Sequence, residues 1–323
     1  MPALLNTVDP EGLEEFSVVF TDRSLNHMSA AFQGVMRDIS AMLKEVYNAE
    51  AVAVVPGGGT FGMEAVARQF ARGVEVLVVR NGWFSYRWSQ IIENGDLTGN
   101  ATVLKARMQG NSTPAPFAPC PIDEVLEAIR AQKPKVVFAP HVETSAGVIL
   151  PDDYIKQMAE AAHEVGALMV LDSIASGCAW VDMKALGIDV LISAPQKGWS
   201  ASPSAGLVMM SARAVARLAE TTSDSFAIDL GKWYSIMQAY ENGGHAYHST
   251  MPTDALRGFR DTMKETQAYG FERLKEAQWR LGDGVRNMLA ERGVVSVAAE
   301  GYGAPGVVVS YTNDPSVQNG KAF

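Results

Sequence analysis

The stretch Leu191-Ile-Ser-Ala-Pro-Gln-Lys-Gly-Trp-Ser200 decides how this chain is interpreted. An apolar run over 190–194 leads into Lys197, and a second apolar run covers 206–210. This pattern predicts a strand, an irregular loop and another strand, with Lys197 at a strand end. Apolar walls disfavour the charged form of a lysine and leave its amine nucleophilic. A lone loop lysine is more often simply exposed, so its partners elsewhere in the chain must decide.

Outward from Lys197, short apolar runs alternate with amphipathic stretches along most of the chain. We predict helices over 26–47, 63–70, 122–131 and 152–165, and strands over 51–55, 75–80, 102–105, 136–139, 168–171 and 190–193. Such alternation predicts an α/β fold whose mostly parallel sheet has helices on both faces. Ligands of such sheets bind at the carboxyl ends of the strands, where the most distinctive loops of this chain are expected.

Composition limits the kind of protein and its partners. The 323 residues carry a formal net charge of −9, so a nucleic-acid partner, which requires a basic surface, is not expected. We see neither a secretory signal nor an apolar run long enough to span a membrane. The two cysteines, Cys120 and Cys178, suit a reducing compartment, and we expect a cytoplasmic location.

The chain is predicted to divide into three parts. These are an N-terminal segment over 1–25, a large ligand-binding domain over 26–260 and a smaller C-terminal α+β domain over 261–323. A long amphipathic helix from 253 to about 292 and a strand over 307–311 are expected near the C-terminus. Because the sequence ends at Phe323 without closing an element, we expect the small domain to be incomplete.

The loop Pro56-Gly-Gly-Gly-Thr-Phe-Gly62 lies between a predicted strand and a predicted helix. Glycines let backbone N–H groups approach an anion, and a helix N-terminus adds partial positive charge, so phosphate is the expected guest. The glycines also match a weak dinucleotide fingerprint, but the next strand closes on Arg80 instead of an acid. An NADP-dependent oxidoreductase therefore stays an alternative, as does a tight turn without a ligand.

Further polar groups follow other strands. Asp172 ends an apolar strand, where a carboxylate requires a positive partner such as a protonated pyridine nitrogen, although an isolated aspartate is more commonly a helix cap. His141 and Glu143 make a poor metal site, so we expect no metal and instead contacts from 141–145 to a ring hydroxyl or to substrate. Phe84 either covers a flat cofactor or belongs to the core. Together these groups are the parts that pyridoxal phosphate requires.

The sequence resembles the class V aminotransferases of fold type I, close to the alanine–glyoxylate and serine–pyruvate aminotransferase group, over roughly residues 25–312. The resemblance is carried by Gly58-Gly-Thr-Phe-Gly-Met-Glu64, Asn81-Gly-Trp-Phe-Ser-Tyr-Arg87, His141-Val-Glu-Thr-Ser-Ala-Gly147, Asp172-Ser-Ile-Ala-Ser176, Ser193-Ala-Pro-Gln-Lys197 and Tyr247-His-Ser-Thr250. It implies a seven-stranded sheet, pyridoxal 5'-phosphate as cofactor, and a homodimer with shared active sites.

The resemblance also implies roles for individual residues. Lys197 would form the Schiff base and transfer the proton, and Asp172 would hold the pyridinium. The other implied cofactor contacts are Gly58, Gly59, Thr60 and Gln196 at the phosphate, Phe84, Ile174 and Ser145 at the ring, and Tyr247 and Thr250 reaching the neighbouring subunit's phosphate. The family's turn near the substrate is replaced by Leu5-Asn-Thr-Val-Asp9, and its substrate-carboxylate arginine would lie beyond Phe323.

These features favour a pyridoxal-phosphate-dependent aminotransferase. It would move an amino group from a small amino acid, such as alanine or serine, to a 2-oxo acid such as glyoxylate or pyruvate. Gln196 separates the chain from cysteine desulfurases, which typically carry histidine before the lysine. An aminoethylphosphonate-type transaminase or a lyase of the same fold stays an alternative. A pyridoxal-phosphate-binding regulator is opposed by the acidic charge and by the lack of an N-terminal DNA-binding module.

Overall fold

The computed structural model of the chain describes residues 25–111, 113–312 and 314. Residues 1–24 of the predicted N-terminal segment, with Leu5–Asp9 among them, lie outside this description, as do residues 315–323.

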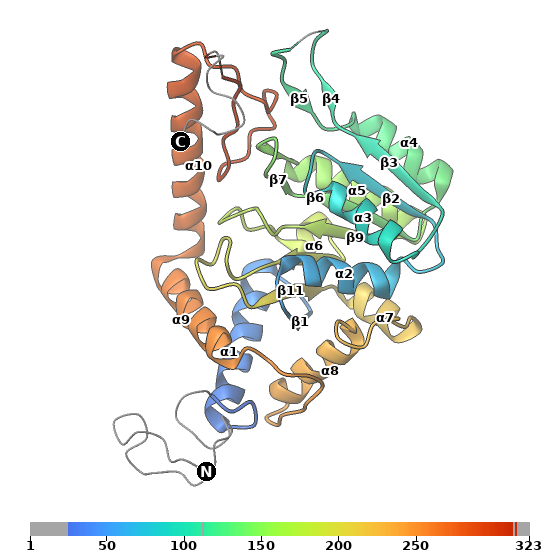
Figure 1. Cartoon of the computed structure of the whole chain (residues 1–323), viewed down its shortest axis with the longest axis vertical. Coiled ribbons are helices and arrows are strands. Elements are labelled where there is room, and N and C mark those ends of the chain that lie inside the picture. Colours follow the sequence, from blue (N-terminus) through green and yellow to red (C-terminus); the bar gives the residue numbers. More distant parts are fainter. Residues whose placement is uncertain (1–24, 112, 313, 315–323) are drawn as a thin grey trace.

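A seven-stranded sheet forms the centre of the described chain, in the order β1-β11-β10-β9-β6-β2-β3 (Figure 1). Its strands are β1 (Ala51–Pro56), β2 (Val76–Arg80), β3 (Ala101–Lys105), β6 (Val136–Pro140), β9 (Leu168–Asp172), β10 (Val190–Ser193) and β11 (Ala205–Met210). Strand β11 runs antiparallel to β1 and β10, whereas the other neighbouring strands are parallel. The predicted α/β fold with a mostly parallel sheet is confirmed.

The central strands are short apolar runs because helices cover both faces of the sheet. β6, β9 and β10 are buried along their whole length, and their valines and isoleucines favour extended backbone. The register pairs Asp172 with Pro140 on one side and with Ile192 on the other. The carboxyl ends of β6, β9 and β10 therefore lie together, and so do the loops that follow them.

Eight helices lie within or beside the sheet-forming part of the described chain. They are α1 (Ala30–Tyr47), α2 (Gly59–Phe70), α3 (Tyr86–Asn94), α4 (Ile122–Gln132), α5 (Asp152–Glu164), α6 (Met183–Leu186), α7 (Ala212–Glu220) and α8 (Leu230–Glu241). Helix α2 packs on β10 and β11, α5 on β9, and α8 on β1. The packing of α2 places its N-terminus beside the loop that follows β10.

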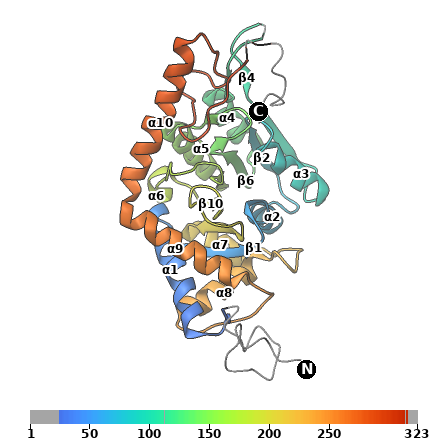
Figure 2. The same cartoon turned by 60° about the vertical axis from the view of Figure 1, so that its left-hand side comes forward.

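The helix expected over 253–292 is wrong as a single element. It forms two helices, α9 (Thr253–Tyr269) and α10 (Phe271–Glu291), which meet at Gly270. Gly270 has a φ of 104°, which is not a helical value, and α9 therefore ends there. Glycine suits this position because side-chain-bearing residues rarely adopt that conformation. Helix α10 runs along one side of the molecule in both views (Figure 1, Figure 2).

Small strand pairs replace parts of the expected loops and tail. β4 (Arg107–Met108) pairs with β5 (Phe117–Ala118), and β7 (Val142–Glu143), within the stretch 141–147, pairs with β8 (Val148–Ile149), which follows that stretch. The strand expected over 307–311 is wrong. The described tail pairs only at single positions with different segments, as Ser296 does with Ser310, so no continuous ladder forms.

The predicted boundary between residues 260 and 261 lies inside α9. Leu256, Phe259 and Met263 of this helix are buried in the main core together with residues of α1 and the sheet. The division into a large and a small domain stays a prediction.

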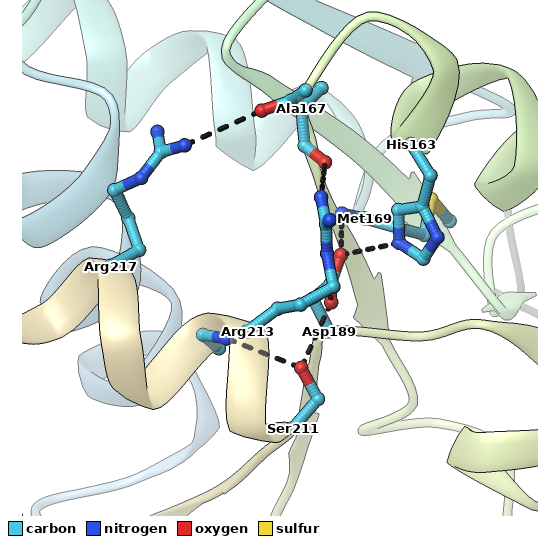
Figure 3. A network of polar contacts seen from close by, with 9 residues as sticks. His163, Ala167, Met169, Asp189, Ser211, Arg213 and Arg217 are labelled. Carbon is cyan, nitrogen blue, oxygen red and sulfur yellow. Dashed lines mark hydrogen bonds and ion pairs between the residues drawn. The ribbon is translucent and has the colours of Figure 1, made fainter.

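A buried aspartate fixes the start of β10, the strand that leads to Lys197 (Figure 3). Asp189 is 1% exposed and accepts hydrogen bonds from His163 Nε2, the Met169 amide and Ser211 Oγ, each at 2.9 Å. Arg213 Nε lies 3.3 Å from Asp189 Oδ1, the oxygen that also accepts from Ser211. Burial alone would raise the pKa of Asp189, but the hydrogen bonds from His163 and the Met169 amide hold it below its ordinary value.

We expect Asp189→Ala to lower the free energy of unfolding by about 2–4 kcal/mol at pH 7, because it leaves buried donors without an acceptor. The lowered pKa of Asp189 makes its contribution complete above the unfolded-state pKa, and that contribution is lost as the pH falls through the folded-state value. The difference between wild type and variant should therefore shrink below about pH 4. Urea denaturation across pH tests this, with exposed Asp153→Ala as control; equal losses in both variants would contradict it.

Candidate active site

A cleft of about 220 Å³ lies at the carboxyl ends of the parallel strands. Its lining residues come from the carboxyl end of β9 and from the loops and first turns that follow β1, β2, β6, β9 and β10: Gly59, Thr60, Met63, Phe84, Arg87, Val142, Thr144, Asp172, Ile174, Ala175, Gln196 and Lys197. The fold thus brings together most of the predicted site residues, which are Gly59, Thr60, Phe84, Asp172, Ile174, Gln196 and Lys197.

The N-terminus of α2 forms one end of the cleft. Its cap residue is Gly58, and no acidic side chain lies in its first turn, so α2 itself supplies no anion to its N-terminal N–H groups and partial positive charge. Glycines allow this helix to approach its neighbours closely. A Cβ on Gly59 would lie 2.6 Å from Ile174 Cδ1, and one on Gly206 of β11 would lie 2.6 Å from the Gly62 amide nitrogen.

Asp172 is the buried carboxyl group of the cleft, with 7% of its surface exposed. Its Oδ1 accepts one hydrogen bond, from the Ile174 amide at 3.0 Å. Burial raises the pKa of Asp172 to about 7, and Glu143 adds to the rise while Arg87 and Lys197 oppose it. A cationic partner in the cleft would hold this carboxyl group ionised.

Lys197 lies in the loop after β10 and lines the same cleft. The expected enclosure by apolar walls is wrong, because the side chain is exposed. The loops that carry Lys197 and Asp172 are nevertheless fixed against each other. A Cβ on Gly198 would overlap the carbonyl oxygen of Gly177, so these two glycines are in direct backbone contact.

Glu143 is fully buried and holds the loop that presents Phe84. Its oxygens accept hydrogen bonds from the Phe84 amide at 3.1 Å, the Ser85 amide at 2.9 Å and Ser85 Oγ at 2.6 Å. Ser145 Oγ donates to Glu143 at 2.7 Å and accepts from the Trp83 amide at 2.9 Å. The expectation that Glu143 contacts substrate is wrong, because these internal contacts occupy its carboxylate.

We expect Glu143→Gln to lower the free energy of unfolding by about 2–3 kcal/mol, because an amide replaces one acceptor oxygen with a donor facing donors. Phe84 should lose its fixed position, and ligand affinity at the cleft should fall with it. Thermal melting and ligand titration of the same sample test this. Glu276→Gln on exposed α10 is the control, and unchanged stability of Glu143→Gln would contradict the role.

His141 lies apart from the cleft lining. It is 2% exposed, its Nδ1 lies 2.8 Å from Ser176 Oγ, and its pKa is lowered to about 3 by burial and by Lys275. The expectation that it contacts ring or substrate is wrong, since it lines a separate cavity beside α10.

Four predicted site residues do not line the cleft. Gly58 adjoins it as the cap of α2, and Ser145 is engaged with Glu143 and the Trp83 amide. Tyr247 is 66% exposed and Thr250 is also exposed, both in the segment between α8 and α9. Their proposed contact with a second subunit therefore stays a prediction.

The sequence interpretation missed Arg87, which lines the cleft. Its Nη1 donates to Thr60 Oγ1 at 2.9 Å, and its guanidinium lies 5.4 Å from the centre of the Phe84 ring. One signal was available, since Arg87 follows Phe84 by three residues where the helix after β2 begins. The Arg87 amide bonds to the Phe84 carbonyl at 3.1 Å, and this single turn brings the two side chains to the same side.

Comparison with known proteins identifies the family. The model of the class-V aminotransferases matches residues 13–309. The chain belongs to this family. It is 27% identical over 286 residues to the small subunit of a soluble hydrogenase from Synechococcus sp., covering 88% of this chain and 71% of that protein. It is also 27% identical to an L-aspartate–glyoxylate aminotransferase from Paracoccus denitrificans, covering 81% of this chain and 64% of that protein.

Solved structures of other class-V aminotransferases share the fold. An alanine–glyoxylate aminotransferase from Nostoc sp. superposes with a TM-score of 0.78 at 21% identity, covering 90% of this chain and 74% of that one. A ureidoglycine–glyoxylate aminotransferase from Bacillus subtilis gives a TM-score of 0.75 at 22% identity, covering 91% and 73%. The predicted type I fold is confirmed.

Two further features concern membranes and metals in residues 25–111, 113–312 and 314. None of their helices combines the length and apolarity needed to cross a bilayer. Within the same residues, no three His, Cys, Asp or Glu side chains gather as metal ligands.

Proposed function

We propose that this class-V aminotransferase uses pyridoxal 5'-phosphate to move an amino group from a small amino acid, alanine- or serine-like, to a 2-oxo acid such as glyoxylate or pyruvate. The observation that carries the proposal is the convergence of Lys197, Asp172, Phe84 and the N-terminus of α2 on one cleft.

The residues present fit this cofactor on three counts. Asp172 is a buried carboxyl group with one hydrogen bond, which suits a protonated ring nitrogen. Gln196 lines the cleft, and its side-chain NH2 group can donate a hydrogen bond to an anion. Ile174 occupies the space that a Cβ on Gly59 would fill, so backbone rather than side chain faces the ligand there. An anion at α2 would satisfy the remaining donors.

When bound, the cofactor ring supplies an electron sink for the carbon that loses its proton. Lys197 Nζ would hold the cofactor, and its amine would serve as the base that takes up and returns the proton of the substrate carbon. Asp172 keeps the ring nitrogen protonated by ionising beside it. Phe84 limits water access to the ring face, while Gly58, Gly59, Thr60 and Gln196 fix the phosphate.

The remaining expectations form part of the same proposal. Ser145 acts beside the ring through the loop it shares with Glu143. Tyr247 and Thr250 reach the phosphate of a second copy in a homodimer, and their exposure agrees with this. An aminoethylphosphonate-type transaminase or a lyase is the alternative activity, and a cytoplasmic location stays a prediction.

The cofactor is tested by an absorption spectrum of the purified protein before and after borohydride reduction, with mass mapping of the peptides. A visible band that bleaches, with added mass on Lys197, is the expected result. A colourless protein that stays unlabelled after incubation with pyridoxal phosphate would refute the proposal. A panel of amino donors with glyoxylate and pyruvate then tests the substrates, and activity only with aminoethylphosphonate would favour the alternative.

A further inference from the structure

Arg87 places a full positive charge where the fold already supplies a partial one. Its Nη1 is 2.9 Å from Thr60 Oγ1, in the first turn of α2. Helix N-termini favour negative groups and disfavour cations, so this arrangement is unfavourable unless an anion lies between them.

Among the described residues, no acidic side chain contacts Arg87 directly, and Asp172 acts on it only through space, across the cleft. Its guanidinium meets the Thr60 hydroxyl and the Phe84 ring, neither of which is anionic. The cap residue is a glycine, and the first turn of α2 contains no acid. Of the charged residues that line the cleft, two are cations, Arg87 and Lys197, and one is the carboxyl group of Asp172.

The shape of the site adds to this charge. Arg87 is half-buried and lies one turn after Phe84. Glu143 fixes the backbone of Phe84 by accepting a hydrogen bond from its amide. The guanidinium is therefore held in place before a ligand arrives, which reduces the entropy lost on binding. Its planar fork suits two oxygens of one phosphate group.

We propose that Arg87 is a further ligand of the cofactor's phosphate, acting with Thr60 and the N-terminus of α2. The inference rests on the proposed function. In this proposal Arg87 makes the affinity of the cleft for pyridoxal phosphate depend on the phosphate dianion, whereas other residues hold the ring. A residue that only clamped the loop to α2 would support ligands with and without phosphate equally.

The test is a fluorescence titration of the whole chain with pyridoxal phosphate and, separately, with pyridoxal, which lacks the phosphate. We expect Arg87→Gln to weaken pyridoxal phosphate binding by about 10–100-fold while changing pyridoxal binding less than about twofold. Arg87→Lys should recover part of the loss, because it keeps the charge without the fork. Inorganic phosphate should compete with pyridoxal phosphate less well in Arg87→Gln than in wild type.

The matched control is Arg80→Gln. Arg80 ends β2, lies 4.8 Å from the Tyr86 ring centre and does not line the cleft, so its loss should leave both affinities unchanged. Equal weakening of both ligands by Arg87→Gln, or no weakening of either, would overturn the inference while leaving the proposed function standing. A wild-type chain that binds neither ligand would refute the proposed function, and the inference with it.

Discussion

We expect the Lys197→Ala protein to transfer amino groups at least about 10³-fold more slowly than the wild-type chain. Under the proposed function, the variant loses both the amine that would hold the cofactor and the base that would move the proton. Its fold should survive, because Lys197 is exposed and its loop is fixed through backbone contacts of Gly198. Single-turnover absorbance measurements with an amino donor check the rate, and borohydride reduction checks attachment.

Lys232→Ala is the matched control for this experiment. Lys232 is an exposed lysine on α8, so its removal should change neither turnover nor labelling. Wild-type-like turnover in Lys197→Ala would remove the central residue from the proposed chemistry. Loss of activity together with loss of the thermal transition would instead point to a structural role.

The second large effect concerns Asp172→Asn. We expect turnover to fall by about 10²-fold, with a smaller loss of cofactor affinity, because asparagine cannot stabilise a positive charge on the ring nitrogen. The comparison of turnover with affinity separates electronic control from simple binding. Equal turnover in variant and wild type would refute this role.

The same variant should be more stable than wild type when no cofactor is added. The pKa of Asp172 is raised to about 7, so the folded chain keeps a proton that the unfolded chain has released, and stability falls as the pH rises from about 4 to about 7. Asparagine carries no such cost. We expect a gain on the order of 2–4 kcal/mol at pH 8, disappearing below about pH 4. Urea denaturation checks this, and a variant less stable than wild type at pH 8 would contradict it.

The sheet and the main site residues could be predicted because they depend on local pattern and on topology. Apolar runs of four to six residues predicted β9 and β10, and parallel pairing then required Asp172 and the Lys197 loop to meet at one edge. The conformations of these side chains depend on distant neighbours. The apolar runs on either side of Lys197 favoured an enclosed side chain, but it is exposed, as loop lysines ordinarily are.

Other features of the structure depend on contacts between residues that are far apart in the sequence. Glu143 binds backbone N–H groups of residues 84 and 85, which lie far from it in the chain and carry no recognisable signature. The break at Gly270 was hidden because the apolar periodicity continues across it. His141 was expected at the ring or the substrate, but it lies buried beside Ser176, a partner 35 residues away that the sequence around His141 does not indicate.

The contact between Gly177 and Gly198 constrains how this enzyme can be altered. Because any side chain at position 198 would displace the backbone of the loop that follows Asp172, this loop and the loop that carries Lys197 can change only together. New substrate preferences are therefore best sought at other lining residues such as Met63 and Thr144, which lie outside both glycine positions. A variant library that keeps both glycines should retain cofactor chemistry in far more of its members than one that randomises them.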